Sequence, residues 1–271
     1  MEHPLAYIER GSRALPSLIL LHGFMGSKDD WDEVMDRLEE HYHCIAIDLP
    51  GHGESLLPED SFAYTFDGLS CEILKLMRQL MIEQVDLLAY SMGGRLAYHL
   101  ILHHPQYFRH AFIESASPGI RDDKERKQRL LKDLTLADRL ENEDFGEFLK
   151  DWYAQEIFSS LAGEGDLLEG LIKRRLQNDP TYLAIALRAM TVGNQTPLWD
   201  ILGSLSVPVV QVAGALDSKY CEIVDEVSAC TEYAQKVVLE GLGHNAHFEN
   251  TDAFCGILKT ENLWTESLSQ I

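Results

Sequence analysis

The chain has 271 residues, and with 45% apolar and 25% charged side chains its composition excludes a disordered or fibrous protein. Its 44 acidic side chains outnumber 23 basic ones, and the formal charge of −21 excludes nucleic acids and anionic membranes as expected partners because both would repel it. The sequence has neither a signal-like start nor an apolar run long enough for a membrane span, so we predict a soluble, cytoplasmic protein.

The first part of the chain alternates between apolar runs that are typical of buried strands and segments in which apolar residues have helical spacing. We predict strands at residues 17–24, 43–48, 84–90 and 110–116. Helices are predicted between them, at residues 29–42, 65–82 and 92–103. Such alternation indicates right-handed βαβ units, and therefore an α/β fold with a mostly parallel sheet covered by helices on both faces.

The alternation stops near residue 117 and resumes near residue 200. In between, four amphipathic helices are predicted, at residues 122–140, 144–158, 166–179 and 181–190. Strands at residues 207–217 and 236–244, each followed by a helix, complete the pattern. We therefore predict an α/β core formed by residues 1–116 and 200–271, with a helical cap at residues 117–199 inserted into it.

The segment Leu87–Leu100 changes from a strand pattern to a helix pattern at one hydroxyl-bearing residue, Ser91. The pentapeptide Ala-Tyr-Ser-Met-Gly around it matches the nucleophile elbow, with alanine in the first glycine position. Small side chains on both sides of the serine let the strand and the helix approach closely. The pattern therefore predicts a strained turn that exposes the Ser91 hydroxyl.

A serine hydroxyl needs a histidine to accept its proton and an acid to orient that histidine. Asp217 and His244 each follow a predicted strand, and the carboxyl ends of parallel strands are where catalytic groups gather. The chain order Ser, Asp, His is the one that this architecture requires, so we predict Ser91, Asp217 and His244 as a catalytic triad. We favour His244 over His247 because two glycines form a tight loop just before it, and we expect Asp225 on the solvent face of a helix.

Two backbone amides are candidates for an oxyanion hole. Met92 opens the helix after the serine, and Phe24 lies in the loop after the first buried strand. Three polar residues near these loops, His22, Asp48 and His52, have a structural interpretation: we expect them to brace loops.

The sequence has no motif for a nucleotide or a metal, since it contains no G-x-G-x-x-G, P-loop, C-x-x-C or H-E-x-x-H pattern. We therefore expect no cofactor and no metal. The scattered cysteines have apolar neighbours, which predicts buried free thiols at Cys44, Cys71, Cys221, Cys230 and Cys255. Whether the protein is a monomer or a homo-oligomer is left open by the sequence.

Six motifs taken together resemble the α/β-hydrolase superfamily and, within it, the MenH family of 2-succinyl-6-hydroxy-2,4-cyclohexadiene-1-carboxylate synthases of menaquinone biosynthesis. They are "HGFMGS", "DLPGHGES", "YSMGGR", "ESASPGI", "DWYAQEIF" and "GLGHNAH". The similarity runs over nearly the whole chain, cap included. The "HGF" and serine motifs belong to the superfamily at large, whereas the cap motif and "GHNAH" are much narrower.

The resemblance implies the α/β-hydrolase fold and a lyase reaction on it. Ser91, activated by His244 and Asp217, would abstract a proton from the ring of 2-succinyl-5-enolpyruvyl-6-hydroxy-3-cyclohexene-1-carboxylate, and pyruvate would then be expelled without an acyl-enzyme. The oxyanion hole, Phe24 and Met92, would hold the charge that spreads onto the succinyl carbonyl. The expected partner is therefore a small tricarboxylate.

Alignment with the family's motifs also implies substrate-binding residues. The carboxylate-binding arginines fall on Arg95, Arg129 and Arg175, and Tyr90 and Trp152 match positions near the substrate. Two basic clusters in the predicted cap support an anionic substrate independently, because residues 121–129 hold five cations against three acids and residues 173–175 read Lys-Arg-Arg. The helical registers leave Arg126 and Arg174 open as alternatives to Arg129 and Arg175.

The triad also supports other hypotheses. A serine hydrolase acting on a small ester, thioester or vinylogous diketone would use the same three residues for acyl transfer. Its sign would be an acyl-enzyme trapped on Ser91. A binding protein that kept the fold and lost turnover is a third class, against which the intact triad argues.

Overall fold

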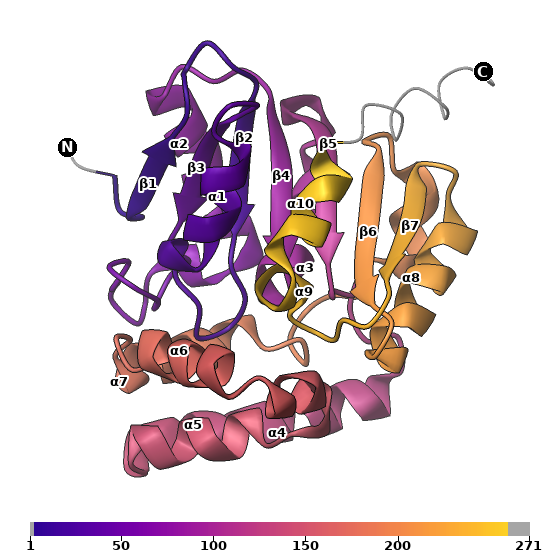
Figure 1. Cartoon of the computed structure of the whole chain (residues 1–271). Coiled ribbons are helices and arrows are strands. Elements are labelled where there is room, and N and C mark those ends of the chain that lie inside the picture. The colour runs from indigo at the N-terminus through magenta and orange to yellow at the C-terminus, as the bar shows by residue number, and fades with distance from the viewer. Residues whose placement is uncertain (1–2, 260–271) are drawn as a thin grey trace.

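The computed structural model of the protein describes residues 3–259. Its centre is a seven-stranded sheet with the strand order β1-β3-β2-β4-β5-β6-β7 (Figure 1). Neighbouring strands run parallel except at one edge, where β1 pairs antiparallel with β3. The strands are β1 (Tyr7–Arg10), β2 (Ser17–Leu21), β3 (His43–Ile47), β4 (Val85–Tyr90), β5 (Phe108–Glu114), β6 (Val209–Gly214) and β7 (Ala234–Leu239).

Helices cover both faces of this sheet, as the predicted mostly parallel arrangement requires. The core helices are α1 (Asp32–Leu38), α2 (Phe66–Gln79), α3 (Met92–His103), α8 (Ser218–Cys230), α9 (Ala246–Glu249) and α10 (Thr251–Leu258). Successive residues of a strand point to opposite faces, so Ile19 and Leu87 pack with α2, α3 and α8, whereas Leu20 and Leu88 pack with α1 and α10. Both faces of the sheet are therefore buried, which fixes the ends of its strands in space.

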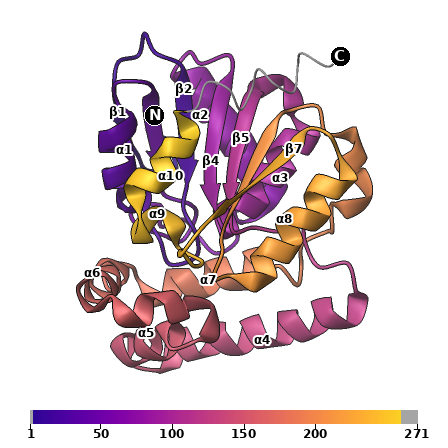
Figure 2. The ribbon, with the colours of Figure 1, turned by 45° about the vertical axis from the view of Figure 1, so that its right-hand side comes forward.

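Between β5 and β6 the chain forms a helical cap. Its helices are α4 (Asp123–Asn142), α5 (Phe145–Tyr153), α6 (Gly165–Arg175) and α7 (Pro180–Met190), with the 3-10 helix η4 (Glu156–Gly163) after α5. Figure 1 and Figure 2 show these helices as a layer across the end of the sheet at which the parallel strands finish. Phe148, Leu171 and Leu183 of the cap form a buried cluster with Met25 from the loop after β2. The cap thus packs directly on the loops that follow the strands.

Several predicted boundaries differ from the structure; the strand predicted at residues 236–244, for example, is Ala234–Leu239, and three further differences have a clear cause. Strand β1 is not predicted, because its four residues are all half-buried and show no alternation. Strand β2 ends at Leu21, three residues early, because the chain turns there into the glycine-containing loop. The helix predicted at residues 144–158 ends at Tyr153, and extended backbone at Gln155 separates it from η4.

The cysteines are free, but the prediction that all are buried is wrong. Cys44 and Cys255 are buried and Cys221 is half-buried, whereas Cys71 and Cys230 are exposed. The last two lie on the outward faces of the amphipathic helices α2 and α8, where their apolar neighbours in sequence point elsewhere. None of the helices within residues 3–259 combines the length and the apolar character that crossing a membrane requires.

Candidate active site

Ser91 forms the sharp turn between β4 and α3, and its backbone adopts φ 50° and ψ −107°. A positive φ costs a non-glycine residue about 1–3 kcal/mol, so the surrounding packing must hold the turn. A Cβ at Gly93 would lie 2.4 Å from the carbonyl oxygen of Leu21 in β2, which shows how closely α3 passes the sheet. Ala89, where the elbow pattern usually has glycine, is a fully buried residue of β4. The predicted strand-to-helix turn is therefore present, with the serine at its apex.

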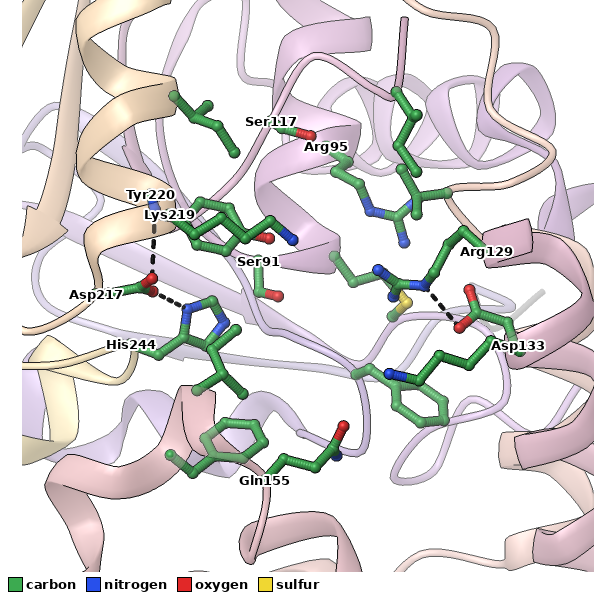
Figure 3. A pocket seen from close by; sticks show the side chains of 18 of the residues that line it. Ser91, Arg95, Ser117, Arg129, Asp133, Gln155, Asp217, Lys219, Tyr220 and His244 are labelled. Atoms are coloured by element: carbon green, nitrogen blue, oxygen red, sulfur yellow. Dashed lines mark hydrogen bonds and ion pairs between the residues drawn. The ribbon is translucent and has the colours of Figure 1, made fainter. Parts of the chain in front are cut away.

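His244 and Asp217 are joined by a hydrogen bond of 2.6 Å from the imidazole Nδ1 to the carboxylate Oδ2 (Figure 3). Asp217 is also the N-cap of α8, where its Oδ1 accepts the backbone N–H of Tyr220 at 3.3 Å. The acid thereby favours the tautomer with the proton on Nδ1 and leaves Nε2 able to accept one. Both side chains are buried and line the same cavity as Ser91, so the three predicted triad residues are brought together.

The alternatives to this histidine and this acid lie elsewhere. His247 pairs with Glu114, with 2.7 Å between Nδ1 and a carboxylate oxygen, and both residues are buried beside the site rather than lining the cavity. Asp225 is exposed on α8, as expected, and pairs with Lys236. The geometry therefore agrees with the choice of His244 and Asp217.

Phe24 and Met92 both line the cavity. Met92 is the first residue of α3, a position at which a backbone N–H has no carbonyl partner within its own helix. Within residues 3–259, neither backbone amide donates a hydrogen bond to another residue. Both are thus available to an oxygen that gains negative charge near Ser91.

The triad opens onto a cavity of about 930 Å³ between the core and the cap. Core residues such as Ser91 and His244 form one wall, and cap residues such as Trp152 and Phe158 form another. This volume is typical of a small-molecule site. The cap is therefore part of the site and not only a cover for it.

Arg95 lies partly exposed in this cavity, four residues after the serine on α3 (Figure 3). Its guanidinium donates to the side-chain oxygen of Gln195 at 3.1 Å and to the carbonyl oxygen of Met190 at 2.8 Å. Both acceptors are neutral, and burial together with the nearby Arg129 lowers the pKa of Arg95 to about 10. A cation held in this way is electrostatically unsatisfied and favours a bound anion.

Arg129 and Arg175 also line the cavity, but each already has a carboxylate partner. The Nε of Arg129 lies 2.8 Å from Asp133, one helical turn away on α4 (Figure 3). Arg175 is buried, and its Nη1 lies 2.7 Å from Asp30. Burial opposes the charge on Arg175, but Asp30 raises the pKa of this guanidinium above its usual value.

The structure separates the predicted cap arginines from their alternatives. Arg126 and Arg174, each one position or turn away from the predicted residues, do not line the cavity within the described part of the chain. Arg126 instead pairs with Asp123 on the outside of α4. The registers predicted for Arg129 and Arg175 therefore place those two side chains at the site.

Tyr90 and Trp152 provide aromatic surface close to the serine, and both line the cavity. The ring centroid of Tyr90 lies 5.4 Å from that of His244. A Cβ at Gly23 would lie 2.6 Å from the Tyr90 ring, which explains the glycine of the "HGF" motif. Trp152 on α5 packs against Phe24 with a centroid distance of 5.6 Å, so the cap touches the candidate oxyanion loop.

Among the cavity residues that the sequence analysis missed, Lys219 and Tyr220 lie close to the triad. Lys219 extends into the cavity from the first turn of α8 (Figure 3), and burial together with Arg129 lowers its pKa. The ring of Tyr220 lies 4.9 Å from that of His244. The signal was available, because a helix that begins at the predicted catalytic acid Asp217 must place its first turn beside the site.

The three residues with a predicted structural role do brace loops. The Nε2 of His22 accepts the backbone N–H of Leu49 at 2.9 Å, and Asp48 accepts the backbone N–H of Lys28 at 2.6 Å. Burial lowers the pKa of His22 to about 4 and that of His52 to about 3. Both histidines are therefore neutral near pH 7 and serve packing and hydrogen bonding.

Residues 16–251 match the model of the α/β hydrolase fold family. The 2-succinyl-6-hydroxy-2,4-cyclohexadiene-1-carboxylate synthase of Serratia proteamaculans is 32% identical over 253 residues, which cover 93% of this chain and 95% of that protein. The synthase of the same name from Salmonella typhimurium is 33% identical over 89% of this chain and 91% of that protein.

Solved structures give the same result for the fold. MenH from S. aureus is similar over 99% of this chain and 100% of that one, with a TM-score of 0.89 and 27% identity. The enol-lactonase from Burkholderia xenovorans is similar over 98% of this chain and 96% of that one, with a TM-score of 0.79. At 19% identity, the second likeness shows the fold alone.

Proposed function

Since the chain belongs to the α/β-hydrolase fold family and, within it, to the family of 2-succinyl-6-hydroxy-2,4-cyclohexadiene-1-carboxylate synthases, we propose that it is a carbon–oxygen lyase of menaquinone biosynthesis. It eliminates pyruvate from 2-succinyl-5-enolpyruvyl-6-hydroxy-3-cyclohexene-1-carboxylate and leaves the synthase product. A cytoplasmic location stays a prediction from the sequence.

The names of substrate and product locate the bonds that change. The ring proton on C2, beside the succinyl carbonyl, is removed, and the electron pair left on C2 forms a double bond to C3. The double bond at C3 shifts to C4, and the C5–O bond breaks so that the oxygen leaves with the electron pair as the enolate of pyruvate. Ser91 acts as the base: its hydroxyl takes the C2 proton while its own proton passes to Nε2 of His244. Asp217 stabilises the imidazolium that results, and no bond forms between the serine and the substrate. The imidazolium gives its proton to the departing enolate, which leaves as the enol of pyruvate and restores neutral His244.

Negative charge spreads from C2 onto the succinyl carbonyl oxygen as the proton leaves. The backbone amides of Phe24 and Met92 hold this charge. Because such donors act on charge that develops only in the transition state, they accelerate the reaction without tightening ground-state binding. Tyr90 and Trp152 pack against the ring of the substrate.

The substrate carries three carboxylates, and we assign to them three of the arginines that line the cavity: Arg95, Arg129 and Arg175. A guanidinium can pair with a carboxylate through two parallel hydrogen bonds. Arg95 carries the strongest support for this role, because its two present partners are neutral.

One observation carries the proposal: the cavity that holds the Ser-His-Asp arrangement also holds an unbalanced cation, in a chain with a formal charge of −21. A hydrolase of neutral esters has no need of such a cation. A polyanionic substrate does need it, because the charge of the whole chain opposes its approach.

The test is pyruvate release from freshly generated enolpyruvyl substrate, coupled to NADH oxidation by lactate dehydrogenase, with Ser91→Ala alongside. We expect rapid release that the variant loses. Turnover of simple esters with an acyl-enzyme mass on Ser91, and no pyruvate above background, would identify the serine hydrolase instead. Robust turnover of either kind that Ser91→Ala abolishes would exclude a binding protein without activity.

A further inference from the structure

The loop that carries His244 is held by the side-chain carboxylate of Glu249. Glu249, in α9, folds back so that its Oε2 accepts the backbone N–H of Gly243 at 2.8 Å and its Oε1 accepts that of Asn245 at 3.2 Å. These two amides flank the catalytic histidine on either side. Hydrogen bonds to a charged acceptor are among the stronger ones in proteins. We call the two bonds from Gly243 and Asn245 to Glu249 the clasp, and they fix the backbone from which the imidazole projects.

The same carboxylate is reached by the cap. Ser160, in η4, donates its hydroxyl proton to Oε1 of Glu249 at 3.0 Å. The views in Figure 1 and Figure 2 agree that α9 lies at the end of the core that faces the cap. The clasp therefore joins the histidine loop to an element of the cap that is distant in sequence.

Steric contact at Gly243 points to the same junction independently. A Cβ there would lie 2.1 Å from the Ser160 hydroxyl oxygen and 2.7 Å from its Cβ. The backbone of Gly243 is not in the left-handed region, so the serine, and not the conformation of the loop, excludes a side chain. A second cap residue, Phe158, meets the imidazole of His244 edge-on at 5.8 Å between ring centroids.

We propose that Glu249 is a positioning residue for His244. Through Ser160, it makes the placement of the histidine depend on how the cap packs against the core. The carboxylate is suited to this because both of its oxygens accept. In a glutamine, one of the two would be an amino group that can only donate, so one flanking N–H would lose its acceptor. The inference requires the triad but not any particular substrate.

The first test is Glu249→Gln, with Glu240→Gln as the matched control. Glu240 is an exposed acid shortly before the same loop, so its replacement removes the same charge without touching the clasp. We expect Glu249→Gln to lower kcat for pyruvate release by about tenfold with KM within about twofold, and Glu240→Gln to change neither. The rate at which phenylmethylsulfonyl fluoride labels Ser91 should fall in the same proportion.

The labelling rate separates this proposal from the proposed lyase activity, because it reports activation of the serine whatever the natural substrate is. Slow labelling of Glu249→Gln would therefore support the clasp even if no pyruvate were released. Labelling and kcat both within about twofold of the unmodified protein would overturn it.

The second test examines the contact between Ser160 of the cap and Gly243 of the histidine loop. It does not use Glu249→Gln, so it can be carried out even if that variant does not fold. Gly243→Ala should slow the labelling of Ser91, and adding Ser160→Gly should restore much of the rate by removing the clashing side chain. A role confined to the stability of the loop predicts no such rescue. If the double variant is no faster than Gly243→Ala, the link between the cap and the histidine is wrong.

Discussion

Asp217 acts through its bond to one ring nitrogen, so an amide at this position should be nearly as damaging as loss of the histidine. Asparagine keeps the shape but can present its amino group to Nδ1, which favours the wrong tautomer. We expect Asp217→Asn to lower kcat by roughly 10³–10⁴-fold. Asp225→Asn, on the exposed face of the same helix, is the control and should leave the rate of pyruvate release unchanged.

We expect substrate binding to depend on the planar shape of the Arg95 guanidinium as well as on its charge. We expect Arg95→Met to lower kcat/KM by roughly 10–100-fold, the loss that one charged hydrogen-bonded contact represents. Arg95→Lys should recover only part of this, because an ammonium cannot pair with a carboxylate in two parallel bonds. Steady-state pyruvate release measures both, with Arg126→Met as the control outside the cavity. A value for Arg95→Met within about twofold of the unmodified enzyme would remove Arg95 from the binding site.

Single residues differ in how far the sequence reveals their role. The placement of Ser91, Asp217 and His244 at one cavity was predictable because each follows a strand and the chain order fits one architecture. The pairing of Arg175 with Asp30 was not predictable, because the two residues are 145 positions apart and only the packing of the cap on the core brings them together. The exposure of Cys71 was missed for a related reason, since neighbours in sequence do not report the face of a helix.

At the scale of the elements, the contact between α3 and β2 should be intolerant of even a methyl group. A Cβ at Gly93 would approach a sheet carbonyl to 2.4 Å, and backbone in a central strand cannot yield. We expect Gly93→Ala to reduce the free energy of unfolding by roughly 1–3 kcal/mol, measured by urea denaturation.

A second glycine provides the control for this experiment. Gly170 is an exposed residue within α6, and a Cβ there would meet nothing within 4 Å. Gly170→Ala should therefore stabilise the protein by roughly 0.5–1 kcal/mol, because alanine is the better helix former. A destabilisation by both changes would show that the effect at position 93 is not steric.

Helices and strands were predicted best where apolar residues recur at a regular spacing and a sequence motif marks where the element begins or ends. Helix α3 begins and ends at the predicted residues, since the elbow fixes its start and its apolar face is continuous. The turn after Tyr153 was missed, because the residues of η4 are as apolar as those of α5 and only the backbone at Gln155 divides them.

For the molecule as a whole, buried neutral histidines should make stability depend on pH. Burial lowers the pKa of His52 to about 3, against about 6.5 in an unfolded chain. Its contribution is fully present above pH 6.5 and is lost as the pH falls below that value, because the unfolded chain binds the proton first. The loss is roughly 1.4 kcal/mol per pH unit for each such group.

This dependence can be assigned by substitution. We expect His52→Gln to flatten the fall in the free energy of unfolding between about pH 6 and 4.5 by close to one proton. His41→Gln, which removes an exposed histidine, should leave the slope unchanged. Equal slopes for all three proteins would mean that His52 is protonated in the native state.

Because the cap is inserted between β5 and β6, these two strands cannot pair until late in synthesis. Strand β5 ends at Glu114, and its partner begins only at Val209. While the ribosome adds the residues between them, one edge of β5 stays unpaired, and such edges invite association with other chains. Pairing across so long a separation is also slow. The candidate catalytic centre, two of whose three side chains come after β6, can therefore assemble only when most of the chain has been made.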